Sequence, residues 1–260
     1  MTDLLPAPEG APAAATPTPV TPPSPLPAWQ DLAIYVAGGF GVFLLASLAL
    51  GLVIGRPGIW TSLAIYLVNF VCLGGAVYVW GIRRRKFTWT DIGLWPLKWR
   101  WYWPLLVVGI ALALLPLRAG LGLLVEWLLR GNLQSLQNRA QIFAPNAQFS
   151  WLDFAVTLFG VGVLAPISEE LYFRGLIHRW FQPRFKFWVR VLISTSFFAL
   201  GHFDSAAVVA SSFILGLACA VVYERSQSLW MSILLHAFNN SVAVVLVYAL
   251  MALSQFLPKV

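Results

Sequence analysis

The stretch AAVVASSFILGLACAVVY, residues 206–223, decides the class of fold. It contains no Asp, Glu, Lys, Arg or His. A run of about 18 mostly apolar residues is long enough to cross the hydrocarbon core of a bilayer as a helix. The sequence therefore predicts a transmembrane helix here.

Similar apolar segments occur along most of the chain. Hydrophobic residues make up 59% of the 260 residues and charged residues only 10%, against roughly 25% charged in soluble domains. The predicted spans are residues 32–54, 60–82, 103–127, 151–180, 189–202, 206–223 and 229–253. The fifth is short for a full span. We therefore predict an all-α, polytopic integral membrane helical bundle of about 7 (6–8) transmembrane helices.

The chain is expected to have two parts. Residues 1–28 hold nine of the seventeen prolines together with Ala, Thr and Ser. This composition cannot bury a core, which predicts a disordered tail. Residues 29–255 are expected to form the helical membrane domain, with no further soluble domain.

Basic residues predict the orientation. Loops 83–100 and 179–190, with Arg225, carry eleven of the seventeen Lys and Arg residues and fall on one side of a seven-span arrangement, whereas Arg118 is counted on the other side or near it. The positive-inside rule then places the N-terminus and both loops in the cytoplasm and the C-terminus outside a plasma or inner cell membrane. The net charge is +7, and the basic residues that produce it lie between apolar runs. Nucleic acid is therefore not an expected partner.

Three segments carry polar residues inside predicted spans. They are SEELYFRG (168–175), FFALGHFD (197–204) and LLHAFNNS (234–241). Ionisable residues cost roughly 2.5–3.5 kcal/mol each near the centre of a membrane helix and persist when paired or functional. At about 1.5 Å of rise per residue, the three segments reach a similar depth of roughly 16 Å from the cytoplasmic end. The sequence predicts one shared polar chamber, open toward the cytoplasm.

Spacing assigns different directions to the two glutamates of the first segment. Glu170 and Arg174 are four residues apart on one helix face, which predicts an ion pair. Glu169 points about 100° away, so it is expected to face the chamber. His178, one turn further on, is expected at the membrane interface.

The other two segments show the same four-residue spacing. Phe198 precedes His202 and is expected to pack beside its ring, and His236 precedes Asn240 so that both side chains can reach one substrate atom. Asn239 is expected to point away from Asn240 and to serve structure. Cys72 and Cys219 lie in apolar runs without metal-binding spacing and are interpreted as small buried hydrophobes.

The motifs EExxxR (169–174), FxxxH (198–202) and HxxxN (236–240) match in order and spacing the signature of a known family. Over residues 150–245 the chain resembles the CAAX prenyl endopeptidase and bacteriocin-processing (CPBP) family of intramembrane peptidases. The string DIGLWP (91–96) also resembles the segment that precedes the later helices in that family.

The resemblance implies a role for each matched residue. Glu169 would be the general base and His202 would help hold or activate water, while His236 and Asn240 would form an oxyanion hole. Glu170, Arg174 and Phe198 would support the site. The implied substrate is a hydrophobic or lipidated peptide, such as a prenylated CAAX peptide cut near its C-terminus.

Four alternatives stay open. No cofactor or metal is expected, yet Glu169, His202 and His236 offer three ligands to a catalytic zinc with one open position. The resembled family also includes proteins associated with bacteriocin self-immunity and proteins associated with scaffolding, so a non-catalytic role is possible. A transporter or proton relay would use similar intramembrane residues, although no inverted repeat is evident.

Overall fold

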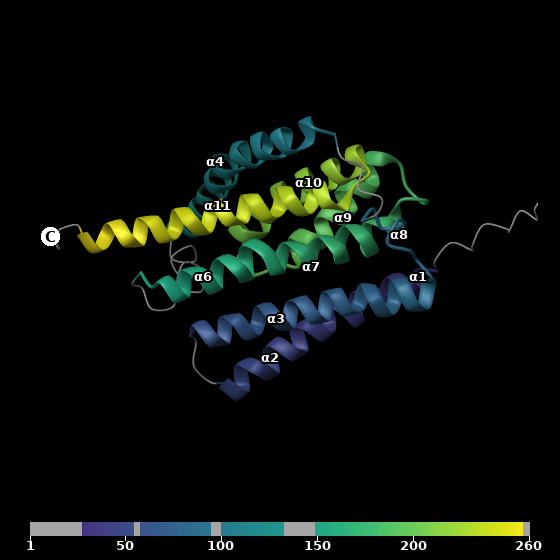
Figure 1. The fold of residues 1–260 in the computed structure, drawn as a ribbon, viewed down its shortest axis with the longest axis horizontal. Helices are drawn as coiled ribbons and strands as arrows, with labels where there is room; N and C mark the ends of the chain where they lie inside the picture. The colour runs from purple at the N-terminus through teal and green to yellow at the C-terminus, as the bar shows by residue number, and fades with distance from the viewer. Residues whose placement is uncertain (1–27, 55–57, 95–99, 133–148, 257–260) are drawn as a thin grey trace, which may run out of the picture.

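The computed structural model describes residues 28–54, 58–94, 100–132 and 149–256. The predicted tail, residues 1–28, lies outside this part of the chain except for Ala28. The described residues form long helices that run roughly parallel and antiparallel to one another (Figure 1). The predicted all-α architecture is confirmed.

Six helices in the described residues are long and apolar enough to cross a membrane. A seventh, α9 (Phe187–Leu200), is apolar but shorter, as the sequence indicated for this segment. The six long helices are Trp29–Ile54, Ile59–Arg84, Tyr102–Arg130, Trp151–Phe181, Ala206–Ser226 and Leu229–Gln255.

Three of these long helices contain π-helical turns. The first consists of α1 (Trp29–Tyr35), η1 (Val36–Gly41) and α2 (Val42–Ile54), and the second of α3 (Ile59–Ala76) and η2 (Val77–Arg84). The fourth consists of α6 (Trp151–Phe159), η3 (Gly160–Leu164), α7 (Ala165–Tyr172), η4 (Phe173–His178) and α8 (Arg179–Phe181). The others are α4 (Tyr102–Arg130), α10 (Ala206–Ser226) and α11 (Leu229–Phe256). Such π-helical turns are frequent at functional sites, and two of them, η3 and η4, flank α7, which carries the two glutamates.

Glycine allows the helix of α6 and η3 to approach α3 closely. A Cβ on Gly160 would lie 1.9 Å from the ring of Tyr66, a distance that no side chain could tolerate. The absence of a side chain at Gly160 thus lets α3 pack against η3. This contact holds the entry to α7 in place.

Residues 88–94, which include the start of the DIGLWP string, form a turn that supports the helix ends. Asp91 accepts hydrogen bonds from the backbone N–H and the hydroxyl of Thr88 at 2.8 and 2.9 Å. Ile92 is fully buried. Gly93 adopts a φ of +82°, which a residue with a side chain rarely adopts, and its carbonyl accepts from the Leu229 N–H at 2.8 Å. The turn therefore fixes the start of α11.

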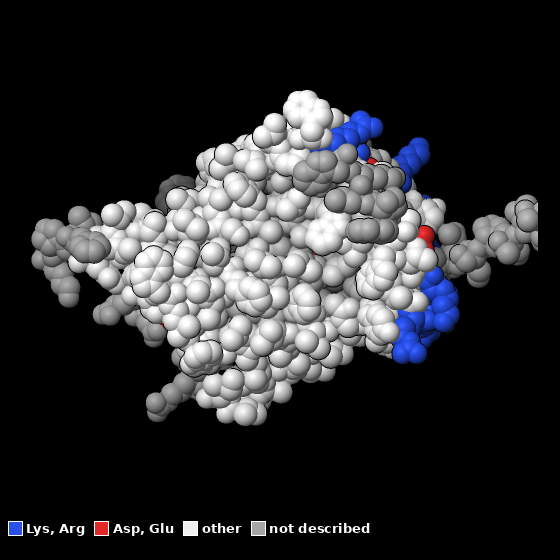
Figure 2. Space-filling view, viewed as in Figure 1, with Lys and Arg blue, Asp and Glu red and all other residues white. Residues whose placement is uncertain are grey.

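Basic side chains gather at one end of the molecule, and the rest of the visible surface carries almost no charge (Figure 2). Contacts between remote segments hold this end together. Asp31 pairs with Arg85, and Trp180 donates to the carbonyl of Ala28 at 3.0 Å. The helix of α1 and α2 thus begins at the end where the first basic loop and α8 lie, whereas α11 ends at the opposite end (Figure 1).

Arg118 lies within α4, inside the predicted span 103–127. It bonds to neighbouring helices, its Nε to the carbonyl and hydroxyl of Ser211 at 3.2 and 3.3 Å. It also donates to the amide oxygen of Asn239. These contacts between helices could not be predicted from the hydropathy of the segment.

Candidate active site

The second glutamate of α7 is the centre of a buried polar cluster. Glu170 is fully buried, and its carboxylate lies 3.2 Å from Nε of Arg174, which forms the predicted ion pair. The same carboxylate accepts a hydrogen bond from Ser232 and lies 2.9 Å from Nδ1 of His236. Since Arg174 also donates to the carbonyl of Gly216 at 2.7 Å, the cluster ties α7 and η4 to α10 and α11.

The first glutamate lies between the two histidines of the later motifs. Oε2 of Glu169 is 3.7 Å from Nε2 of His202 and 3.9 Å from Nε2 of His236. Glu169 is only 7% exposed, and Oε2 has no hydrogen-bond partner among the described residues. A buried polar atom without a partner is rare and commonly marks a bound water, an ion or a catalytic role.

The ring of Phe198 packs against both histidines. Its centroid lies 4.7 Å from that of His202 and 5.6 Å from that of His236. The guanidinium carbon of Arg174 lies 4.7 Å from the same ring, in a cation–π contact. Phe198 thus contacts all three motifs.

His202 lies just beyond the helix in which it was expected. The predicted segment ended at residue 202, but α9 ends at Leu200, and His202 occupies the turn that follows. Its Nδ1 is 2.9 Å from the carbonyl of Phe198. At about 1.5 Å per residue, the fourteen residues of α9 span about 21 Å, which is less than the roughly 30 Å hydrocarbon core of a bilayer.

The two neighbouring asparagines of α11 have different surroundings. Asn240 is partly exposed and donates to the carbonyl of Val161 in η3 at 3.2 Å. Asn239 is fully buried, donates to the carbonyl of Ala111 at 3.0 Å and accepts from Arg118. Asn239 therefore links α11 to α4, in agreement with its expected structural role.

His178 was expected at the membrane interface, and this prediction was wrong. His178 is fully buried. Its Nδ1 lies 2.6 Å from the hydroxyl of Ser194 and its Nε2 lies 2.7 Å from Glu224, which also pairs with Arg190. The sequence could not reveal this network, because Ser194, Arg190 and Glu224 lie 12 to 46 residues away and only the fold brings them to His178.

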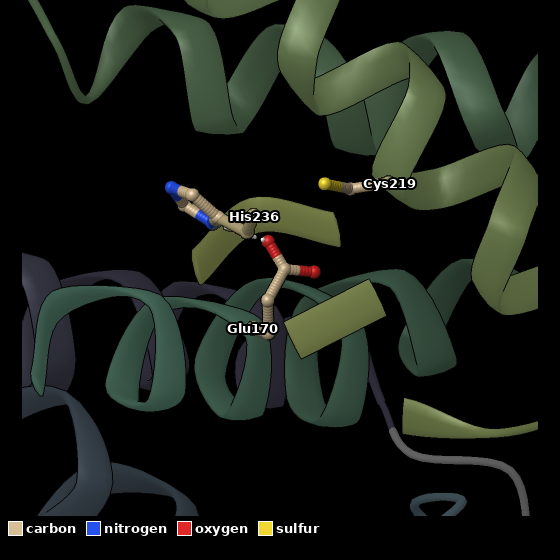
Figure 3. A group of neighbouring side chains, drawn as sticks. All are labelled: Glu170, Cys219 and His236. Atoms are coloured by element: carbon tan, nitrogen blue, oxygen red, sulfur yellow. Dashed lines mark hydrogen bonds and ion pairs between the residues drawn. The ribbon is translucent and has the colours of Figure 1, made fainter. Parts of the chain in front are cut away.

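A second triad of potential metal ligands is present beside the glutamates. The donor atoms of Glu170, Cys219 and His236 lie within 4.8 Å of one another, and all three residues are buried. Figure 3 shows the Glu170 carboxylate directed at one ring nitrogen of His236, while the other nitrogen points away. A metal fits poorly here, because the carboxylate already faces the Arg174 guanidinium and the Ser232 hydroxyl. Cys219 instead packs as the predicted small buried residue.

Comparison with known proteins agrees with the motif pattern. Residues 150–242 match the family described as type II CAAX prenyl endopeptidase Rce1-like. A protein of Escherichia coli described as an uncharacterized 24.3 kDa protein is 33% identical over 88 residues, which are 32% of this chain and 41% of that protein. The match thus spans less than half of the relative. No solved structure matches this chain.

The matched region contains the buried polar cluster around Glu169 and Glu170. Its boundaries agree with the resemblance drawn from the three motifs, which is confirmed. Residues 150–242 of this chain, about a third of its length, thus match the family described as type II CAAX prenyl endopeptidase Rce1-like.

Proposed function

We propose that this protein is an intramembrane endopeptidase that hydrolyses a peptide bond with water activated by Glu169. The observation that carries the proposal is the buried, unpartnered Oε2 of Glu169 between two imidazole Nε2 atoms. A water molecule at this position would satisfy the carboxylate oxygen and would be held by His202. The match of residues 150–242 to an endopeptidase family supports the same reading.

The chemistry follows the usual course of peptide hydrolysis. Glu169 takes a proton from the water, and the oxygen of the water adds to the carbonyl carbon of the substrate. The carbonyl oxygen becomes an oxyanion, which His236 and Asn240 stabilise by hydrogen bonds. When the tetrahedral intermediate collapses, the C–N bond breaks and protonated Glu169 returns its proton to the leaving amine.

Asn240 is able to take part without losing its present contact. The side-chain amide of Asn carries two N–H donors, and one of them is used by the carbonyl of Val161. The second is available to an oxyanion. Because Asn240 lies one helical turn beyond His236 on α11, both donors approach from the same side.

The substrate is proposed to be a hydrophobic or lipidated peptide, with prenylated CAAX peptides as the class to test. The site lies among apolar membrane helices, which suits a lipid-modified chain. The cluster of basic residues at one end (Figure 2) supports a cytoplasmic position for that end in a cell membrane, by the positive-inside rule. No nucleic acid enters the proposal.

The zinc-dependent mechanism is the competing enzymatic reading. Imidazole Nε2 atoms of His202 and His236 face Glu169, and each ring has its Nδ1 near an acceptor, an arrangement also found in histidines that bind metals. A chelator therefore has to be part of the test. The same assay tests the non-catalytic role, because a protein with that role would not hydrolyse the peptide.

The experiment is hydrolysis of an internally quenched, farnesylated CAAX peptide by the full-length protein in detergent, with and without a strong zinc chelator. Activity that resists chelation and is lost in Glu169→Gln supports the proposal. Activity that is lost on chelation and restored by zinc replaces it with the metal mechanism, and activity retained in Glu169→Gln refutes the base assignment.

A matched control is available in α4. Glu126 is another buried glutamate, 2% exposed, and it pairs with Arg130 rather than with the motif residues. Glu126→Gln removes the same charge from a membrane helix and is expected to leave hydrolysis intact. Loss of activity in both variants would show that a folding defect, rather than loss of the base, explains the result.

A further inference from the structure

The hydrogen-bond partners of the two site histidines determine where each ring carries its proton. A carbonyl oxygen accepts but cannot donate. Because Nδ1 of His202 lies 2.9 Å from the carbonyl of Phe198, that nitrogen must carry hydrogen to form the bond. In a neutral His202 ring, Nε2 then presents a lone pair toward Glu169.

His236 is in a corresponding position, with a side chain in place of the carbonyl. Its Nδ1 lies 2.9 Å from Oε1 of Glu170, and its Nε2 lies 3.9 Å from Oε2 of Glu169. The ring thus bridges two consecutive glutamates. Figure 3 shows the Nδ1 side of the ring turned to Glu170 and its other nitrogen directed away.

The surroundings of Glu170 favour a carboxylate rather than a carboxylic acid. Arg174 lies 3.2 Å from Oε2 and Ser232 donates to the same oxygen. The positive charge of Arg174 and the hydrogen bond from Ser232 both stabilise the negative form of the carboxyl. Since Arg174 and Ser232 both lie at Oε2, Oε1 is the acceptor that faces His236.

We propose that Glu170 is a positioning residue that keeps the ring proton of His236 on Nδ1, so that Nε2 can donate to an oxyanion only when the ring carries its second proton. The catalytic meaning of this assignment rests on the proposed function. A doubly protonated ring would lie between the carboxyl groups of Glu169 and Glu170, which offset its charge. The oxyanion would then be met by a cationic donor, and charge-assisted hydrogen bonds are roughly twice as strong as neutral ones.

The chain is well suited to a direct measurement, because it contains only three histidines. We would label the full-length protein with ¹⁵N-histidine and record imidazole ¹⁵N chemical shifts in detergent micelles. These shifts distinguish a nitrogen that carries hydrogen from one that does not. The variants His178→Asn and His202→Gln assign the signals.

Glu170→Gln is designed to reverse the tautomer. The amide oxygen of Gln would pair with Arg174 and Ser232, which are donors, and this leaves the NH₂ group facing Nδ1 of His236. Nδ1 must then accept, and the ring proton moves to Nε2. Ser232→Ala is the matched control, since it removes a hydrogen bond from Glu170 but leaves the carboxylate facing His236.

The expected result is Nδ1–H in neutral His236 of the native protein and of Ser232→Ala, and Nε2–H in Glu170→Gln. An Nε2–H tautomer in the native protein overturns the proposal, as does an unchanged tautomer in a folded Glu170→Gln variant. Should Glu170→Gln fail to fold, the native spectrum alone decides. Because no substrate is needed, an inactive protein with the expected tautomer would count against the proposed function and leave this inference standing.

Discussion

Gly216 in α10 packs so closely against Phe198 in α9 that a Cβ on Gly216 would lie 2.7 Å from Cδ1 of the phenylalanine ring. The ring is 1% exposed and contacts His202, His236 and Arg174. It therefore has little room to move. Because glycine has no Cβ, position 216 leaves room for the Phe198 ring, which contacts residues of all three motifs.

Gly216→Ala is accordingly expected to lower both stability and hydrolysis. Overpacking of a dense core costs roughly 1–3 kcal/mol, and a displaced Phe198 would shift His202 relative to Glu169. Thermal unfolding in detergent and kcat on the farnesylated peptide measure the two effects. Gly120→Ala in α4 is the control, because nothing lies within 4 Å of a Cβ there. Equal behaviour of the two variants would contradict this account of Phe198.

The network around His178 is expected to serve stability rather than catalysis. Ser194→Ala removes the hydroxyl beside Nδ1 of His178 and leaves a buried nitrogen without its partner, at a cost of about 1–3 kcal/mol. Ser196→Ala on the same helix removes a hydroxyl that bonds only to the carbonyl of Leu192 in an exposed position. A lower melting temperature is expected for Ser194→Ala alone, with the KM of both variants unchanged. A similar melting temperature for the two would refute a stabilising role.

The turn at Asp91 is expected to give a pH-dependent contribution to stability. Burial acts to raise the pKa of Asp91, but hydrogen bonds from Thr88 and the charge of Arg179 outweigh it and hold that pKa below its usual value. A lowered pKa in the folded state stabilises the fold above the unfolded pKa of about 3.9, and this contribution is lost as the pH falls through the folded pKa. Melting temperatures of the native protein and Asp91→Asn should therefore differ at pH 6, and the difference should shrink as the pH falls below about 3.9. A difference that persists at low pH would show that shape rather than charge is responsible.

The helical architecture and the motif residues could both be predicted from the sequence, but for different reasons. Membrane helices are predictable because the bilayer requires about 20 apolar residues in each, whatever the fold. Glu170 and Arg174 were predictable as a pair because their contact is local in the helix. The approach of His202 and His236 to Glu169 followed only from a comparison of depths along separate helices.

Contacts between distant segments were beyond this reasoning. His178 looked interfacial because its helix ends nearby, and only the fold brings Glu224 to it across 46 residues. Arg118 lies inside the predicted span 103–127, but the hydropathy of that span gave no indication that Ser211 and Asn239 bind it. The surroundings of such residues depend on hydrogen bonds between distant segments, and the spacing of hydrophobic residues in the sequence does not reveal these bonds.

Asn239 and Asn240 are adjacent in the chain but are expected to respond oppositely to substitution. Asn240→Ala removes a proposed oxyanion donor, so kcat should fall by about 10²–10³ while KM changes little. Asn239→Ala removes partners from Arg118 and from the carbonyl of Ala111, which should lower stability by about 1–3 kcal/mol and leave kcat near the native value. The assay with the farnesylated peptide and thermal unfolding in detergent, applied to both variants, separate the two effects. A kcat loss of similar size in both, or a stability loss confined to Asn240→Ala, would show that the assignment of the two amides is reversed or that α11 acts as a single unit.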